Sequence, residues 1–362
     1  MLLYKIGIGL IKGIGDVRAK KLIAYCGGVE AVFKEKKRLL LKIPGIGKTA
    51  VNEITSQSVL KRAEQEIDFI EKHKITPLFY LDTDYPQRLK HCDDGPILLY
   101  YKGNTDLNAS KVISIVGTRS ATEYGKNICK QITAELAPYN VLIVSGLAYG
   151  IDTAAHKAAL ENKLNTIGVL GHGLDIIYPA ANRELAKKIV NSGGLLTEFL
   201  SQTKPDRENF PQRNRIIAGM SDAVIVVEAA ERGGALITAE IALSYNRDVM
   251  AIPGNLNSVY SRGCNKLIKQ NKAALIESAR DIIYCLGWED VLNKPAQKQM
   301  FVELNAEEEI IVNILKEKTN TAIDEITYKC DFPVSKVATL LLELEFKGVV
   351  NALPGKQFQL AN

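Results

Sequence analysis

Between residues 112 and 254 the chain alternates between short apolar runs and amphipathic segments, and no other feature constrains the fold as strongly. Six apolar runs have the length and composition of buried strands: 112–117, 141–146, 165–171, 193–199, 223–229 and 248–254. Helical patterns follow them near 122–137, 152–162, 182–191, 211–219, 235–246 and 262–270. Strands and helices that alternate at this spacing form right-handed βαβ units. We therefore predict an α/β fold with an extended Rossmann-like parallel sheet.

Nearly every predicted strand ends in glycine, serine or glutamate, and the polar residues stand in the loops that follow. In a parallel sheet of this kind, ligands bind outside the carboxyl ends of the strands. These loops should therefore meet at one edge of the sheet and form the functional site.

The N-terminal fifty residues carry most of the chain's positive charge. They contain eleven lysines and arginines and three acidic residues, so they contribute +8 to a chain whose net charge is +5. A basic end on a near-neutral chain indicates an anionic polymer as partner. A solvated helix surface would explain the charge equally well.

The same region holds a weak internal repeat. IKGIGDVRAKKLI (11–23) is echoed by IPGIGKTAVNEI (43–54), and each copy places Gly-Ile-Gly before a helical segment. This is the pattern of a helix-hairpin-helix, whose turn amides face a phosphate without reading bases. We predict an all-helical domain over residues 1–70, with duplex DNA as a candidate partner. A turn that merely packs is the alternative, and the sequence leaves open whether both hairpins contact DNA.

The remaining segments complete the predicted domain organisation. Residues 75–104 are expected to be irregular, and 71–287 to form the Rossmann domain. Residues 288–300 are interpreted as a linker, and 301–362 as a winged helix with helices near 306–318, 321–329 and 334–347 and a final hairpin. The third of these helices is apolar and mildly acidic. Base readout needs cationic and amide side chains, so a protein-interaction or accessory role is favoured for it.

The loop after the first predicted Rossmann strand reads VGTRS and lacks the GxGxxG pattern of a dinucleotide site. Arg119 offers five donors to phosphate oxygens. The hydroxyls of Thr118 and Ser120 add further donors. The loop is therefore a candidate phosphate site.

The loops after later strands add more candidates. Gly146 lets another chain approach, and Asn182 follows a Tyr-Pro pair. The segment KPDRENFPQRNRIIAG supplies cations, an amide and an aromatic ring near a helix N-terminus: Lys204, Phe210, Arg213, Asn214 and Arg215. Together such groups can hold phosphates and stack a base, which suits single-stranded nucleic acid. The alternative is that Arg213 and Arg215 form ion pairs with Asp206, Glu208 or Glu198.

A different class of function is conceivable at the loop after the fifth strand. Gly233, Gly234 and Glu240 follow the pattern of Rossmann enzymes that hydrolyse nucleoside monophosphates, although the usual PGG is RGG here. Such an enzyme needs a carboxylate in a cleft. This nucleotide-binding enzyme is the second hypothesis.

Cysteines and histidines indicate neither a disulfide framework nor a metal site. The six cysteines are scattered without CxxC spacing, and the four histidines lack ligand spacing. No apolar stretch approaches the length of a membrane span or a signal peptide. We expect a cytoplasmic protein without cofactor, metal or membrane contact.

Six motifs in order give a resemblance to a known family. VGTRSATEYG, SGLAYGIDTAAH, GLDIIYPAAN, FPQRNRIIAG, VVEAAERGGALITAEIA and AIPGNLNSVYSRGCNKLI resemble the DNA processing protein A family (DprA/Smf), and DYPQRLKHCDDGPILLYYKGN precedes them. The flanking domains fit family members with a helical N-terminal domain and a winged-helix tail.

The resemblance implies a homodimer through the Rossmann domain that binds single-stranded DNA and loads the RecA recombinase during natural transformation, without catalysis. By motif, Arg119 should grip phosphate, while Lys204, Phe210, Arg213 and Arg215 should line the pocket. Family members often carry a cation after the Tyr-Pro pair. Here Ala180 stands in that place, and Arg183 or Lys204 is a candidate substitute.

Overall fold

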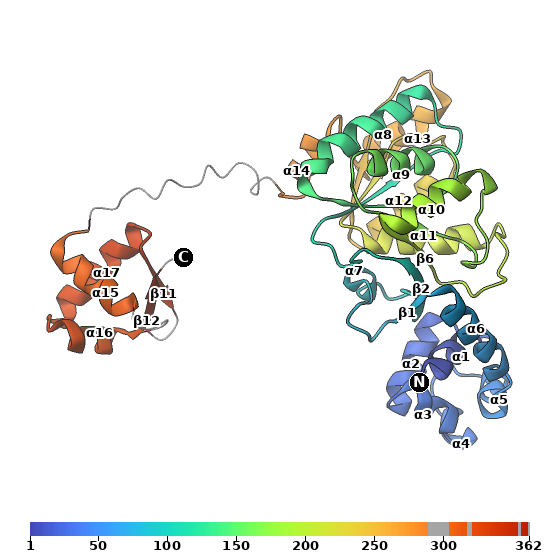
Figure 1. Ribbon diagram of the computed structural model, residues 1–362, viewed down its shortest axis with the longest axis horizontal. Helices are drawn as coiled ribbons and strands as arrows, with labels where there is room; N and C mark the ends of the chain where they lie inside the picture. Colours follow the sequence, from blue (N-terminus) through green and yellow to red (C-terminus); the bar gives the residue numbers. More distant parts are fainter. Residues whose placement is uncertain (289–303, 317–320, 354–355, 361–362) are drawn as a thin grey trace. The chain divides into compact units, whose positions relative to one another are not determined.

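The computed structural model describes residues 1–288, 304–316, 321–353 and 356–360. The chain divides into two compact units, Met1–Trp288 and Glu289–Asn362. Figure 1 shows a layered α/β sheet in the first unit, with a group of small helices at one end of it. None of the described helices is long and apolar enough to cross a membrane.

The first unit is built on a nine-stranded sheet in the order β1-β2-β6-β5-β4-β3-β7-β8-β9. The six predicted strands are present as β3 (Val112–Val116), β4 (Leu142–Ser145), β5 (Thr166–Val169), β6 (Gly193–Thr197), β7 (Ala223–Val226) and β8 (Asp248–Ala251). All six run parallel, as does the short β9 (Ala274–Leu275). The prediction of an α/β fold with a Rossmann-like parallel sheet is confirmed.

Helices cover both faces of this sheet, and successive side chains along each strand point alternately into two apolar cores. One face packs α8 (Glu123–Leu136), α9 (Ile151–Glu161), α10 (Arg183–Asn191) and α14 (Ala279–Cys285), using Ile113 and Ile143. The other packs α11 (Asn209–Met220), α12 (Gly234–Ser244) and α13 (Arg262–Lys269), using Val112 and Val144. Burial on both sides explains why the strands are continuous apolar runs.

The expectation that residues 75–104 are irregular is wrong. They contain β1 (Thr76–Phe79), α7 (Gln87–Lys90) and β2 (Leu98–Gly103), and β2 pairs antiparallel with both β1 and β6. Three prolines and Gly95 break the sequence pattern here, and a proline is tolerated in an edge strand such as β1. The strands therefore extend the sheet without the alternation that marks the others.

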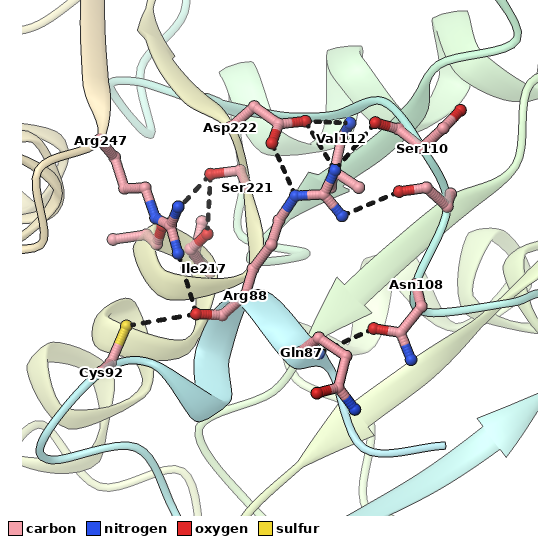
Figure 2. A network of polar contacts seen from close by, with 12 residues as sticks. Gln87, Arg88, Cys92, Asn108, Ser110, Val112, Ile217, Ser221, Asp222 and Arg247 are labelled. Carbon is pink, nitrogen blue, oxygen red and sulfur yellow. Dashed lines mark hydrogen bonds and ion pairs between the residues drawn. The ribbon is translucent and has the colours of Figure 1, made fainter. Parts of the chain in front are cut away.

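An ion pair ties this extension to the rest of the sheet, as Figure 2 shows. Arg88 Nε donates to Asp222 Oδ1 over 2.7 Å and Arg88 Nη2 donates to Asp222 Oδ2 over 3.0 Å. The same guanidinium donates to the carbonyls of Ala109 and Ser110, while Val112 N donates to Asp222 Oδ2. The network fixes α7 against the start of β3 and the residue before β7.

Six helices precede the sheet: α1 (Leu2–Gly9), α2 (Asp16–Cys26), α3 (Val29–Lys34), α4 (Lys37–Leu40), α5 (Lys48–Ser56) and α6 (Leu60–His73). Their apolar core continues into Phe79, Ile97 and Tyr100 of the sheet extension. Buried Glu66 accepts hydrogen bonds from the amide and the hydroxyl of Ser201, which adds a polar link. The helical segment therefore packs directly on the sheet.

The second unit has the order of a winged helix, as predicted. It contains α15 (Ala306–Lys316), β10 (Thr321–Ala322), α16 (Ile323–Cys330), α17 (Val334–Phe346) and the hairpin of β11 (Val350–Leu353) and β12 (Gln357–Leu360). Strand β10 pairs with β12, and a separate apolar core holds the helices. The predicted linker lies outside the described residues from position 289 onward.

Candidate nucleic-acid interface

A cavity of about 1050 Å³ opens at the carboxyl ends of β3 and β7. The strand order reverses between these two strands, because β4 to β6 lie on one side of β3 and β7 to β9 on the other. Such a switch point leaves a crevice between neighbouring loops. Its walls are the turn after β3, the N-terminal half of α11, the loop before α12, and α13. The predicted convergence of the loops is observed here.

The turn after β3 is rigid. Thr118 N donates to Glu228 O over 2.7 Å, and Thr118 O accepts from Ile151 N over 3.2 Å. Gly150 faces this turn with φ +77°, and a Cβ there would lie 2.2 Å from Thr118 O. Ser120 N donates to Thr118 Oγ1 over 3.2 Å. The backbone therefore holds Arg119 out at the mouth of the cavity.

A buried carboxylate occupies the N-terminus of α8. Glu228 accepts from Thr122 Oγ1 over 2.6 Å and from Thr122 N over 2.9 Å. A Cβ on Gly125 would lie 2.2 Å from the same carboxylate. A dinucleotide fold places its pyrophosphate at this helix end. Because Glu228 already supplies the negative charge, the geometry disfavours a dinucleotide, in agreement with the missing glycine pattern.

Arg119 and two aromatic rings form the accessible part of the site. The Arg119 guanidinium carbon lies 5.2 Å from the centroid of the Phe210 ring. The Tyr178 ring centroid is 6.0 Å from that of Phe210, and Tyr178 is 43% exposed. An exposed cation beside ring faces can hold a phosphate while a base stacks. Tyr178 was missed in the sequence, although its place in the Tyr-Pro pair could have indicated it.

Arg213 lies in the floor of the cavity and is only 4% exposed. Its Nη1 donates to the carbonyl of Gly146 over 2.6 Å and also to the carbonyl of Val169. Burial lowers the pKa of Arg213 to about 10, and the carboxylate of Asp152 opposes this shift. Asp152 in turn accepts from the amides of Gly146 and Ala148. The guanidinium thus joins the ends of β4 and β5.

Arg215 does not line the main cavity. It is 7% exposed, and its Nη2 donates to Glu198 Oε2 and, over 3.2 Å, to Asp16 Oδ2. It faces a smaller crevice of about 340 Å³ instead. The alternative that these arginines form ion pairs therefore holds for Arg215, which pairs with Glu198. Arg213 instead faces Asp152, which is not one of the three acids considered from the sequence.

The remaining predicted residues take different places. Asn182 is buried and donates to Leu147 O and Thr153 Oγ1, which anchors the loop after β5. Asn214 lines the cavity, while Lys204 is exposed just outside the residues that line it. Three cations that the sequence analysis did not single out line the cavity: Arg207, Arg232 and Lys266. Ala180 is exposed, and a cation at its position would reach solvent.

The carboxylate of the second hypothesis, Glu240, lines the cavity wall and faces solvent. The Glu240 side chain is 65% exposed and lies 3.6 Å from Lys272 Nζ. Gly233 and Gly234 open α12 at the cavity wall. Across the described ranges, no group of three or more potential metal ligands occurs. The loop therefore offers an accessible helix end rather than an enclosed acid.

The sheet, the switch-point cavity and the small second unit define a class: α/β proteins with a Rossmann-like binding site and a winged-helix unit. Residues 76–287 match the family described as DNA recombination-mediator protein A, and residues 295–356 match the DprA winged helix domain. The chain belongs to the DprA/Smf family.

Individual relatives agree with this assignment. Protein Smf of Synechocystis sp. is 34% identical over 393 residues and covers 98% of both chains. DNA processing protein DprA of Streptococcus pneumoniae is 44% identical over 213 residues, which are 59% of this chain and 75% of that protein.

Two solved structures are similar as well. The crystal structure of Streptococcus pneumoniae DprA matches with a TM-score of 0.69 and 36% identity over 78% of this chain and 98% of that chain. Helicobacter pylori DNA processing protein A, described with a unique single-stranded DNA binding mode, matches with a TM-score of 0.54 and 30% identity. This second match covers 59% of this chain and 96% of that one.

Proposed function

We propose that this chain binds single-stranded DNA in the switch-point cavity and acts as a recombination mediator. The observation that carries the proposal is the exposed Arg119 guanidinium over the Phe210 ring at the cavity mouth. The single-stranded DNA binding described for the Helicobacter pylori relative supports it. The site binds single strands without sequence preference, because every base can stack on a ring face.

Each group has a role that follows from its exposure. Arg119, Lys204 and Arg207 are exposed cations and contact phosphates; Phe210 and Tyr178 offer ring faces to one or two bases. The hydroxyls of Thr118 and Ser120 and the amide of Asn214 add hydrogen bonds. Arg213, Gly146 and Asn182 are positioning residues, since Arg213 donates to the Gly146 carbonyl and Asn182 donates to the Leu147 carbonyl. Arg215 positions α11 through Glu198.

Fluorescence anisotropy of a labelled poly-dT oligonucleotide in a salt series tests this function. Arg119→Ala should lose more than ~1.4 kcal/mol of binding free energy, about tenfold, because charged hydrogen bonds to phosphate disappear. Arg280→Ala on α14 is the matched control, since it removes an exposed arginine from the opposite face of the sheet. Equal binding by both variants would show that the cavity mouth is not the DNA site.

We further propose a homodimer and delivery of the bound strand to RecA. Apolar side chains within 234–275 support the dimer, because Leu256 and Leu275 lie outside the cavity lining and are 82% and 50% exposed. One site per subunit would raise avidity on long strands. Light scattering of Leu256→Asp should give a monomer, and RecA-dependent strand exchange should speed up in the presence of wild type. If Leu256→Asp remains a dimer, the proposed dimer face is wrong. If wild type does not accelerate strand exchange, delivery of the strand to RecA is wrong.

Nucleoside monophosphate hydrolysis is the second candidate, and the geometry favours it less. A catalytic carboxylate works in a site that excludes water, whereas the Glu240 side chain, although it lines the cavity, is 65% exposed beside Lys272. We propose a binding protein without this catalysis in a cytoplasmic setting. Hydrolysis by wild type that Glu240→Gln abolishes would restore the enzyme hypothesis.

A further inference from the structure

The two Gly-Ile-Gly turns of the helical segment have the same backbone. Gly13 and Gly45 take φ values of +81° and +85°, and both are followed by an extended glycine, Gly15 or Gly47, at the helix N-cap. In each turn the isoleucine amide bonds back to the isoleucine carbonyl three residues earlier, over 3.0 Å and 3.2 Å. The predicted repeat is thus a structural repeat, and differences between the copies lie in their side chains.

The first hairpin makes hydrogen bonds and an ion pair with other parts of the first unit. Asp16, directly after its Gly-Ile-Gly, accepts from Ile97 N over 2.9 Å and from Arg215 Nη2 over 3.2 Å. Lys20 on the same helix donates to the carbonyl of Asp93 over 3.1 Å. An acid at the helix start and contacts with the sheet extension leave this copy poorly suited to phosphate.

The second hairpin has the opposite character. The residue that corresponds to Asp16 is Lys48, and residues 36–52 contain no acidic residue. Four further cations precede it on and around α4, and all five are exposed: Lys36, Lys37, Arg38, Lys42 and Lys48. Among the described residues, none of these five forms an ion pair. Figure 1 shows α4 and α5 on the side of the helical segment away from β1 and β2.

We propose that this cationic surface, residues 36–48, binds the phosphate backbone of duplex DNA. Five uncompensated charges on one short segment gain binding free energy through release of counterions from DNA. Residues 36–48 contain no aromatic side chain, so the surface lacks the stacking platform that single strands need. Contacts to phosphates alone hold a duplex without reading its sequence. The surface is separate from the switch-point cavity, and the proposal does not rest on the proposed function.

The test uses the full chain and a labelled duplex of 24 base pairs, with unlabelled poly-dT in excess to occupy the cavity. The triple variant Arg38→Gln, Lys42→Gln, Lys48→Gln should bind the duplex about tenfold more weakly, and its log–log salt slope should fall by roughly 2.7, about 0.9 for each lost phosphate contact. A matched triple variant, Lys61→Gln, Lys72→Gln, Lys157→Gln, removes three exposed lysines elsewhere and should stay within about twofold of wild type on the same counterion argument.

Two further outcomes separate this surface from the cavity. Arg119→Ala should keep duplex binding, and the first triple variant should keep poly-dT binding. Absence of duplex binding by wild type, or equal weakening by both triple variants, overturns the proposal whatever the single-strand result. All six substituted side chains are exposed, and circular dichroism of both variants checks that they fold.

Discussion

At the scale of single residues, the site separates groups that face solvent from groups that are already bonded. Arg119 and Tyr178 are exposed to solvent. Arg213 and Asn182 are buried and donate hydrogen bonds to backbone carbonyls near the strand ends. Buried donors generally find acceptors, and Arg213 Nη1 and Asn182 Nδ2 find them in backbone carbonyls near the strand ends. Affinity should therefore depend on a few exposed side chains.

The Phe210 ring gives the first residue-scale prediction. Phe210→Leu keeps an apolar side chain but removes the ring face, so binding of poly-dT should weaken by about 1–3 kcal/mol. Phe210→Tyr keeps the ring and should bind like wild type. Anisotropy titrations measure the affinity of both variants for poly-dT. If the leucine variant binds as tightly as the tyrosine variant, no base stacks on this side chain.

Backbone geometry gives a second prediction. Gly150→Ala should destabilise the first unit by about 1–3 kcal/mol, because its φ of +77° disfavours a side chain and its Cβ would lie 2.2 Å from Thr118 O. Gly233→Ala is the matched control, since its φ of 175° is extended and nothing lies within 4 Å of its Cβ. Urea unfolding followed by Trp288 fluorescence measures both, and equal stability would contradict the argument.

Part of the site could be predicted from the sequence alone. Thr118, Arg119 and Ser120 could be placed because they follow a strand whose carboxyl end must lie at the sheet edge. The sequence offers Glu198 as a partner of Arg215, but the second partner, Asp16, lies 199 positions away and could not be predicted. A local pattern carries no information about such a long-range ion pair.

At the scale of elements, the small helix α7 holds the two-stranded extension onto the parallel sheet. Its Arg88 makes a bidentate ion pair with Asp222, and both side chains are largely removed from solvent (20% and 26% exposed). Arg88→Ala leaves Asp222 with only the amide of Val112, and should cost about 1.5–3 kcal/mol of stability. Arg62→Ala serves as comparison, since it removes a different ion pair, with buried Glu66 over 2.8 Å, together with the contact to Ser201.

Thermal unfolding read by circular dichroism measures the effect of Arg88→Ala. Arg88→Lys should recover only part of the loss, because lysine cannot form the paired hydrogen bonds. A lysine variant as stable as wild type would mean that charge alone matters here.

Elements differ in how far the sequence predicts them. The six central strands are continuous apolar runs because helices cover both faces of the sheet. Such runs can be recognised in the sequence. Strand β2 is also an apolar run, but Pro96 and Gly95 precede it and its partners are antiparallel. Its pairing depends on β6, almost a hundred residues later, which only the fold reveals.

At the scale of the whole molecule, the first unit buries ionisable groups whose titration couples its stability to pH. His156 is fully buried beside Arg213, and burial lowers its pKa to about 3. The folded state therefore keeps this imidazole neutral, while the unfolded chain takes up a proton below about pH 6.5. Stability from this group is present above pH 6.5 and is lost as pH falls toward 3.

The matching prediction compares wild type with His156→Gln, which keeps a hydrogen-bonding group near Thr166 Oγ1. Between pH 6.5 and pH 5, wild type should lose about 1.7 kcal/mol more stability than the variant, because the slope grows from half of about 1.4 kcal/mol per pH unit at pH 6.5 toward that full value. The difference between the two curves removes the contributions of His172, Asp152 and Glu198, whose pKa values burial also shifts. Parallel curves would contradict the neutral buried imidazole.

Photocross-linking shows whether single-stranded DNA lies in the switch-point cavity. A poly-dT oligonucleotide carrying 5-iodouridine is bound to the full chain, irradiated, and the cross-linked peptides are identified by mass spectrometry. Base-to-ring stacking places the cross-links on Phe210 or Tyr178, and Arg119→Ala should reduce their yield. Cross-links confined to residues 36–48, to the outer helix α14 or to the second unit would contradict binding in the cavity.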